Sequence, residues 1–256
     1  MKEENPIGVF DSGIGGVTVL REIVKILPNE KYIYYSDSIN NPYGDKSDEE
    51  IIKICENIVK YFIERNCKAI VIACNTASAK AVKYLRNKYK EIPFIAIEPA
   101  YKMVYDYARE ETTLVMATKG TIESEKFNLL YKKYDNHKTI LVPCIGLADT
   151  IENGNKNKIK KCLLKLIGEQ KGKVKNVVLG CTHYPLVEEE IKQILGEDIN
   201  IFNGAPNLAK HLKKVLKENN LIAKEGKEKT IEFIDSSNSK EKQERFYEYL
   251  NKEEKK

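Results

Sequence analysis

Two cysteines, Cys74 and Cys181, each end a short apolar run and are followed directly by polar residues. The runs are AIVIACNT over residues 69–76 and NVVLGCTH over residues 176–183. Continuous β-branched runs are typical of buried parallel strands, so each thiol is expected at the carboxyl end of its strand. In an open α/β sheet these ends border the ligand crevice. The pair therefore indicates two acid/base groups that face one ligand across a cleft between two similar halves.

The structural alternative is that these cysteines only fill the core, since free cysteine is among the most buried residue types. That interpretation suits Cys55, Cys67 and Cys162, which lie on or beside helical apolar patterns. Cys74 and Cys181 differ because hydroxyl, amide or imidazole groups follow each of them at once. We therefore expect these two to be functional.

A glycine-rich segment, IGVFDSGIGG over residues 7–16, predicts a strand, a turn and a helix. A dinucleotide-binding loop counted from Gly13 would need glycine at position 18, where Thr18 stands, and no Gly-Lys-Ser/Thr follows for a P-loop. The remaining prediction is a turn whose backbone N–H groups meet an anion at a helix N-terminus, which would suit a carboxylate ligand. Two similar polar turns occupy residues 41–44 and 117–121.

Short apolar strands alternate with amphipathic helices along the chain, which predicts parallel sheets with helices on both faces. The expected strands are residues 7–10, 31–36, 68–73, 93–97, 112–117, 139–143, 176–180, 199–202 and 230–235. Ser47 and Glu50 form a capping box before the clearest helix. His211 is expected to pack on the apolar stripe of another helix, and His137 to be exposed in a turn.

The approximate repeat of strand, turn and cysteine in each half predicts two α/β domains. Residues 98–99 and 203–206 are the expected crossings. We predict a first domain of residues 1–97 plus 206–256 and a second of residues 98–205, with the active site in the cleft between them.

Composition narrows the class of protein. The 256 residues are 42% hydrophobic, enough for a full core. The net charge of +5 is spread along the chain and lacks the dense basic stripe of nucleic-acid binders, so no nucleic-acid partner is expected. No apolar stretch approaches the ~20 residues of a membrane span, and no signal peptide is recognised. We expect a cytoplasmic protein with reduced thiols and no metal site.

Five motifs in order resemble the glutamate racemases of the aspartate/glutamate racemase superfamily. They are FDSGIGG over residues 10–16, PYG over 42–44, ACNTA over 73–77, GTI over 120–122 and GCTHYP over 180–185. The resemblance implies a cofactor-independent isomerase that supplies D-glutamate for peptidoglycan. It also implies that Cys74 is the base for D-glutamate and Cys181 the base for L-glutamate.

The resemblance assigns further roles. Asp11 would assist Cys74, His183 would assist Cys181, and Glu152, eight positions after Cys144, would orient the histidine. The implied substrate-binding residues are Asp11, Ser12, Tyr43, Gly44, Asn75, Thr76, Thr121, Thr182 and His183. Several of these are expected to act through backbone donors. Glutamate is the implied small-molecule partner, no cofactor or membrane is implied, and a homodimer is an assembly that the resemblance allows.

Three other functions fit parts of the pattern. A sister racemase acting on aspartate or a hydantoin would use the same pair of thiols, although Asp11, Ser12 and residues 181–183 favour glutamate. A binding or regulatory relative would be expected to have lost one thiol, and both are present. A redox sensor would join Cys74 and Cys181 in a disulfide under mild oxidation and bind no amino acid.

Overall fold

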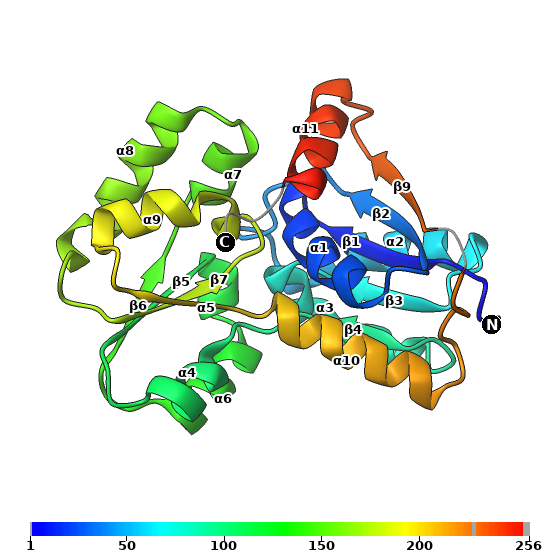
Figure 1. Ribbon diagram of the computed structural model, residues 1–256, viewed down its shortest axis with the longest axis horizontal. Coiled ribbons are helices and arrows are strands. Elements are labelled where there is room, and N and C mark those ends of the chain that lie inside the picture. The colour runs from blue at the N-terminus through cyan, green and yellow to red at the C-terminus, as the bar shows by residue number, and fades with distance from the viewer. Residues whose placement is uncertain (1, 227–228, 253–256) are drawn as a thin grey trace.

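Two parallel sheets make up the fold (Figure 1). The computed structural model describes residues 2–226 and 229–252, and within these the first sheet has the strand order β4-β3-β1-β2-β9 and the second β6-β5-β7-β8. The strands are β1 (Ile7–Asp11), β2 (Lys31–Ser36), β3 (Ala69–Ile72), β4 (Phe94–Ala96), β5 (Thr113–Ala117), β6 (Thr139–Pro143), β7 (Asn176–Gly180), β8 (Asn200–Asn203) and β9 (Thr230–Asp235). Each expected strand is present within one residue at either end.

Helices separate most consecutive strands, as parallel pairing requires. They are α1 (Val17–Ile26), α2 (Asp48–Glu64), α3 (Asn75–Lys88), α4 (Tyr101–Ala108), α5 (Lys119–Ile122), α6 (Glu125–Tyr134), α7 (Leu147–Glu152), α8 (Lys156–Ile167), α9 (Glu188–Leu195), α10 (Ala205–Glu218) and α11 (Lys240–Asn251), with 3₁₀ turns η1 (Ile14–Gly16), η2 (Gly168–Gln170) and η3 (Tyr184–Val187). The capping box at Ser47 is present at the start of α2. The predicted fold class, two parallel sheets flanked by helices, is confirmed.

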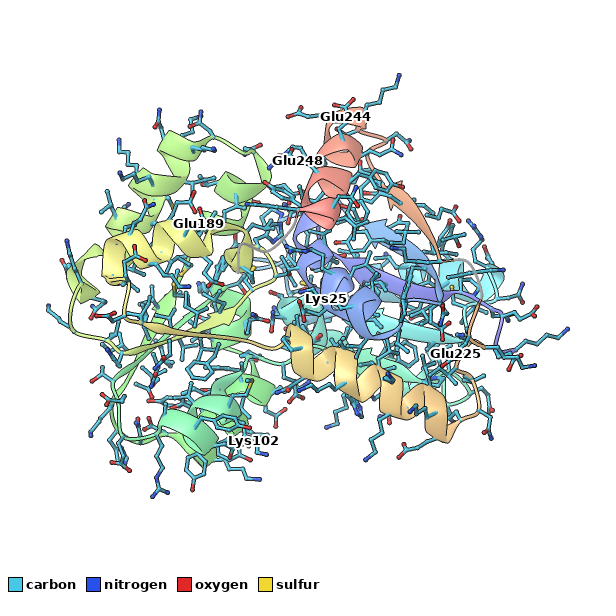
Figure 2. All side chains as sticks on the ribbon, viewed as in Figure 1. Lys25, Lys102, Glu189, Glu225, Glu244 and Glu248 are labelled. Atoms are coloured by element: carbon cyan, nitrogen blue, oxygen red, sulfur yellow. The ribbon has the colours of Figure 1, made fainter. Side chains whose placement is uncertain are left out.

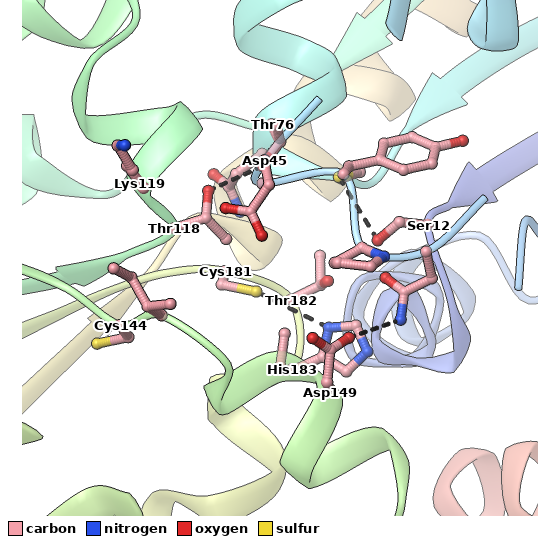
Figure 3. Close-up of a pocket in the computed structure, with 18 of the residues that line it drawn as sticks. Ser12, Asp45, Thr76, Thr118, Lys119, Cys144, Asp149, Cys181, Thr182 and His183 are labelled. Atoms are coloured by element: carbon pink, nitrogen blue, oxygen red, sulfur yellow. Dashed lines mark hydrogen bonds between the residues drawn. The ribbon is translucent and has the colours of Figure 1, made fainter. Parts of the chain in front are cut away.

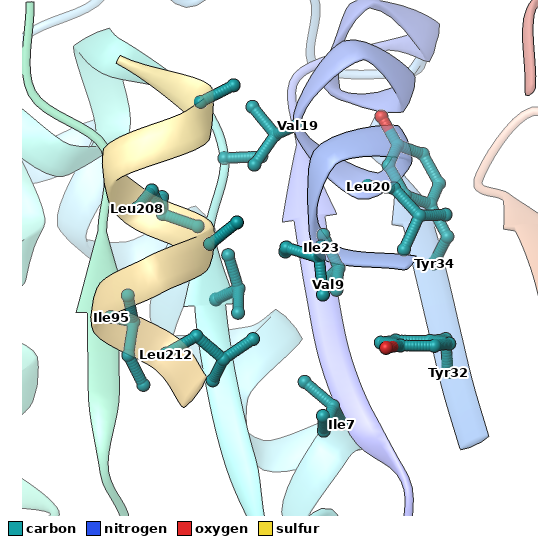
Figure 4. Close-up of a cluster of buried hydrophobic side chains, with 14 of the residues drawn as sticks. Ile7, Val9, Val19, Leu20, Ile23, Tyr32, Tyr34, Ile95, Leu208 and Leu212 are labelled. Atoms are coloured by element: carbon teal, nitrogen blue, oxygen red, sulfur yellow. The ribbon is translucent and has the colours of Figure 1, made fainter. Parts of the chain in front are cut away.

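One face of the first sheet is covered by α1 and α10, whose apolar sides meet the strands (Figure 4). Ile7 and Val9 of β1 pack with Leu20 and Ile23 of α1, and all four are fully buried. The opposite face packs against α2 and α3, and it buries Cys55 and Cys67. The second sheet has its own apolar clusters, against which Cys162 is partly buried.

The expected packing of His211 is wrong, because its side chain is exposed on α10. The helix buries Leu208, Leu212 and Leu216. At 100° per residue, position 211 points well away from the direction that these leucines share. His137 is exposed, as expected.

The chain passes between the two sheets at two places that touch each other. A side chain at Gly204 would collide with the carbonyl oxygen of Glu98, so glycine permits the close approach of these two crossings. We propose the domain boundaries 1–97 plus 206–256 and 98–205 on this basis, with residues 1, 227–228 and 253–256 outside the described part of the chain. Among the helices of the described residues, none has both the length and the apolar character of a membrane span.

The strand registers bring the ends of both sheets to one region. Asp11 of β1 pairs with Ser36 of β2, and the main chain of Ala73 bonds to Phe10. In the second sheet, Ala117 of β5 pairs with Gly180 of β7. The residues that follow these strands therefore emerge side by side, which positions the site described next.

Candidate active site

A cavity of about 40 Å³ is lined by residues from the carboxyl ends of both sheets (Figure 3). The first sheet and its loops contribute Ser12, Asn41, Pro42, Tyr43, Gly44, Asp45, Cys74, Asn75 and Thr76. The second contributes Thr118, Lys119, Cys144, Ile145, Gly146, Ala148, Asp149, Cys181, Thr182 and His183. Both predicted thiols thus line the same cavity, each from a different sheet.

Cys74 is the N-cap residue of α3, directly after β3. Its Sγ accepts a hydrogen bond from the backbone N–H of Ala77 at 3.5 Å and lies 3.9 Å from Ser12 Oγ. Burial raises the pKa of the Cys74 thiol, and the nearby carboxylate of Asp11 raises it further. These surroundings therefore favour Cys74 as a neutral thiol, which can donate a proton.

Cys181 follows β7. Together with His183 and Glu152 it forms a chain of interacting side chains, which we call the relay. Its Sγ lies 3.8 Å from Nδ1 of His183, whose Nε2 is 2.5 Å from Oε2 of Glu152. The Nε2–Oε2 bond links His183 to a carboxylate that is itself 6% exposed. This arrangement can take a proton from the Cys181 thiol and return it.

Opposing influences set the charge of the relay. Burial disfavours the imidazolium of His183, but its hydrogen bonds with Cys181 and Glu152 outweigh burial and hold its pKa well above 6.5. Burial likewise disfavours the Glu152 carboxylate, yet His183 outweighs that effect and lowers the pKa of Glu152. The structure thus favours a charged pair of imidazolium and carboxylate.

Asp11 connects the two sides of the site. Its Oδ2 accepts hydrogen bonds from the backbone N–H of Gly16 at 2.7 Å and from Thr182 Oγ1 at 3.1 Å. Burial raises the pKa of Asp11, although the nearby His183 opposes that effect. Among the described residues, Asp11 Oδ1 and Asn75 Oδ1 are buried acceptors without a hydrogen-bond donor.

The glycine-rich turn after β1 differs from the expectation that it would meet a ligand's carboxylate. Its N–H groups bond to two protein carboxylates: Gly16 to Asp11, and Ile14 to Glu152 Oε1 at 3.2 Å. A Cβ at Gly13 would stand 2.7 Å from Glu152 Oε1, and one at Gly15 would enter the ring of His183. The glycines therefore make room for the relay that arrives from the second sheet.

Three threonines form a hydrogen-bonded group at one side of the cavity. Oγ1 of Thr118 lies 2.9 Å from Oγ1 of both Thr76 and Thr121. Thr76 and Thr118 line the cavity, whereas Thr121 stands behind them. Tyr43 also lines the cavity, and its phenol donates to Asp37 at 2.5 Å.

Sequence reasoning missed several lining residues. Thr118 and Cys144 follow β5 and β6 directly, so the strand-end signal that singled out Cys74 applied to them too. Asn41 lies in the polar turn over residues 41–44 that the sequence indicated, whereas Asp149 lies on a short helix that carried no signal. Their side chains bond to each other, Nδ2 to Oδ1, at 3.1 Å across the cavity (Figure 3).

The polar side chains that line the site are thiols, hydroxyls, amides, the imidazole of His183, the carboxylates of Asp45 and Asp149 and the ammonium of Lys119. All six cysteines of the chain are free thiols. Within residues 2–226 and 229–252, no cluster of histidine, cysteine and acidic side chains has the arrangement of a metal site.

Two parallel sheets that share one cavity at the carboxyl ends of their strands, with a thiol from each sheet lining it, are typical of an α/β enzyme that binds a small molecule. The family model Asp/Glu/Hydantoin racemase matches residues 7–212. The chain belongs to this racemase family.

Individual relatives agree with the family model. The glutamate racemases of Clostridium novyi and Clostridium botulinum are 42% and 40% identical over 242 residues, which is 92% and 93% of this chain and 93% and 94% of theirs. A glutamate racemase from Francisella tularensis, solved in complex with D-glutamate, superposes with a TM-score of 0.82 at 32% identity, over 98% of this chain and 95% of that one.

Proposed function

We propose that this chain interconverts L-glutamate and D-glutamate without a cofactor, using Cys74 and Cys181 as opposed bases. The observation that carries the proposal is the pair of thiols lining one cavity from two different sheets. Inversion at a carbon needs one group to remove a proton from one face while another delivers a proton to the other face. The glutamate racemases among the relatives, one of them solved with D-glutamate, support glutamate as the substrate.

The proton balance assigns a role to each thiol. Starting from L-glutamate, the Cys181 thiolate takes the Cα proton, and the electron pair of the broken C–H bond delocalises into the α-carboxylate. The Cys74 thiol then gives its proton to the opposite face of Cα, forming D-glutamate and leaving a Cys74 thiolate. D-glutamate reacts by the reverse sequence, so the two sulfurs exchange protonation states at each turnover.

The neighbouring groups support this division. His183 lies 3.8 Å from Cys181, and its imidazolium can stabilise the Cys181 thiolate with which L-glutamate reacts. The raised pKa of Cys74 keeps its thiol protonated, the state in which it donates to the carbanion. Asp11 Oδ1 and Asn75 Oδ1 are buried acceptors that a substrate ammonium could satisfy. Backbone and hydroxyl donors around Thr76 and Thr182 are suited to the α-carboxylate, where charge develops.

In the cell, the reaction would supply D-glutamate for peptidoglycan synthesis. The protein would act in the cytoplasm on a free amino acid. A homodimer is compatible with this role.

The test is incubation of the purified protein with L-glutamate in deuterated water. We expect loss of the circular dichroism signal and entry of deuterium at Cα, without added cofactor. Cys74→Ala and Cys181→Ala should each reduce racemisation by at least ~10³-fold, because neither face alone suffices. Unchanged turnover in either variant would remove that residue from its role, and faster reaction with aspartate would reassign the substrate.

A further inference from the structure

The last helix of the described chain, α11, packs on α1 and β9 (Figure 1). A side chain from it also bonds to α7, in the other half of the molecule. The contact is made by Arg245. Its Nη1 donates to the main-chain oxygen of Glu152, and its Nη2 donates to the main-chain oxygen of Ile151 at 3.0 Å. These are the last two carbonyls of α7. The oxygen of Ile151 also accepts from the backbone N–H of Gly154 at 2.9 Å, and a cation at this end of the helix matches the helix dipole.

The guanidinium is itself held in place. Nη2 donates to the hydroxyl of Tyr249 at 3.2 Å, and Cζ lies 5.7 Å from the centroid of the Tyr249 ring. On its other side, Gly154 has φ +70°, and a Cβ there would stand 3.0 Å from Nη2. The chain therefore leaves a fitted space for this one side chain at the end of α7.

α7 depends on such contacts because it is only six residues long. A helix of that length has little stability of its own in water. Its final residue is Glu152, whose carboxylate binds His183 and whose main-chain oxygen binds Arg245. A second side chain from α11, Lys242, places Nζ 3.6 Å from Glu152 Oε1. The end of α7 that carries the relay is thus attached to α11.

We propose that Arg245 is a positioning residue for the Cys181 side of the reaction, acting through Glu152 and His183. The inference rests on the proposed function for its catalytic meaning. The guanidinium bonds to main-chain oxygens, so its effect is to fix the end of α7, whereas Lys242 faces the carboxylate directly. Loss of Arg245 should therefore disturb Cys181 and leave Cys74, on the other sheet, unaffected.

The experiment compares Arg245→Ala and Arg245→Lys with the wild-type full-length protein. Alkylation of Cys74 and Cys181 by iodoacetamide is followed separately by peptide mass spectrometry, together with kcat and KM for L-glutamate. Because the thiolate is the reacting form and the His183 imidazolium stabilises it, displacement of His183 in Arg245→Ala should slow alkylation of Cys181. For Arg245→Ala we expect about a 10-fold fall in kcat and in alkylation of Cys181, with less than about a twofold change at Cys74 and in KM.

Arg245→Lys should recover part of both rates, since an ammonium can donate to one of the two carbonyls. The matched control is Glu244→Ala on the adjacent, exposed position of α11 (Figure 2), which should behave as wild type. Equal changes at both thiols, no change at either, or faster alkylation of Cys181 would each overturn the proposal. If Arg245→Ala does not fold, Arg245→Gln and Arg245→Lys provide the same comparison.

Alkylation needs no turnover, so this readout separates the two proposals. Failure of the wild-type protein to racemise glutamate would contradict the proposed function. The selective effect of Arg245 on Cys181 would still be measured in that protein.

Discussion

His183 lies between a thiol and a carboxylate, and its partners decide its charge. Nδ1 faces Cys181 and Nε2 faces Glu152, so each ring nitrogen has one partner. Burial alone would favour the neutral ring, but the two partners raise the pKa of His183 well above 6.5. The site thereby holds a protonated imidazole beside Cys181 in a buried position.

Replacing Glu152 by glutamine tests this interaction. Glu152→Gln keeps the size of the side chain but removes the charge that stabilises the imidazolium, so the pKa of His183 should fall. We expect kcat to drop by about tenfold or more, and the pH limb assigned to His183 to move to lower pH. Rate measurements across pH 6–10 check this expectation.

The same substitution has a stability signature. The raised pKa of His183 stabilises the fold fully below its unfolded pKa of about 6.5, and that contribution is lost as pH rises through the folded value. The lowered pKa of Glu152 stabilises the fold above about pH 4.3, and that contribution is lost as pH falls through its folded value. The difference in unfolding free energy between the wild type and Glu152→Gln should therefore become smaller as pH rises above 6.5. A deficit that is constant with pH would contradict the charged pair.

The pKa shift of Asp11 lowers the stability of the fold, in contrast to the shifts of His183 and Glu152. Burial raises its pKa, so keeping this carboxyl in the folded protein costs stability wherever the unfolded chain would ionise, above about pH 3.9. Asp11→Asn should raise the melting temperature at pH 7, and this gain should disappear below about pH 3.9. We expect kcat to fall roughly 100-fold. Thermal unfolding and racemisation assays check both effects, and a variant that is less stable yet fully active would refute the argument.

The turn between β1 and α1 shows how a segment from one sheet shapes a site built by the other. Its glycines face Glu152 and His183, and its N–H groups bond to Asp11 and Glu152. The turn thus leaves room for the side chains of Glu152 and His183 and binds the Glu152 carboxylate.

Gly15→Ala tests the turn, because the added Cβ would overlap the imidazole of His183. We expect at least a ~100-fold loss of kcat as the ring is displaced, while the far-ultraviolet circular dichroism spectrum stays unchanged. Gly168→Ala is the matched control, since its Cβ would meet only Leu164 Cδ2 at 4.0 Å in a helical conformation. Equal activity in the two variants would show that the turn has no such role.

The two halves of the molecule enclose a cavity smaller than the proposed substrate. About 40 Å³ holds roughly three water molecules, whereas glutamate has about ten non-hydrogen atoms. We therefore expect the halves to move apart for entry, pivoting where Glu98 meets Gly204. The bond between Asn41 and Asp149 joins the halves at the cavity and should favour the enclosed form.

Asn41→Ala removes that bond and should shift the population toward the open form. A hydrogen bond contributes about 0.5–1.5 kcal/mol, so we expect KM for L-glutamate to rise roughly two- to tenfold with a smaller change in kcat. Steady-state kinetics measures both constants. Asn219→Ala, which removes an asparagine bond to Val215 at the end of α10, is the control and should leave KM unaltered.

Much of the fold is encoded locally. Each β-branched run forms a strand because the residues that favour a buried strand are adjacent in sequence, and Ser47 with Glu50 fixes a helix start in the same way. The placement of Cys74 and Cys181 at strand ends follows from those runs alone. The position of His211 was mispredicted because a short apolar stripe does not define the direction of burial on α10.

The amino-acid sequence by itself therefore determined the strands, the helices and which thiols stand at strand ends, since these depend on neighbours in the chain. Only the tertiary structure decided that both thiols line one cavity and that Thr121 stands behind Thr118. It also decided that the glycine turn binds the carboxylate of Glu152. The bond from Ile14 to Glu152 spans 138 positions. Contacts of that range arise from the packing of two sheets against each other, and no local pattern specifies them.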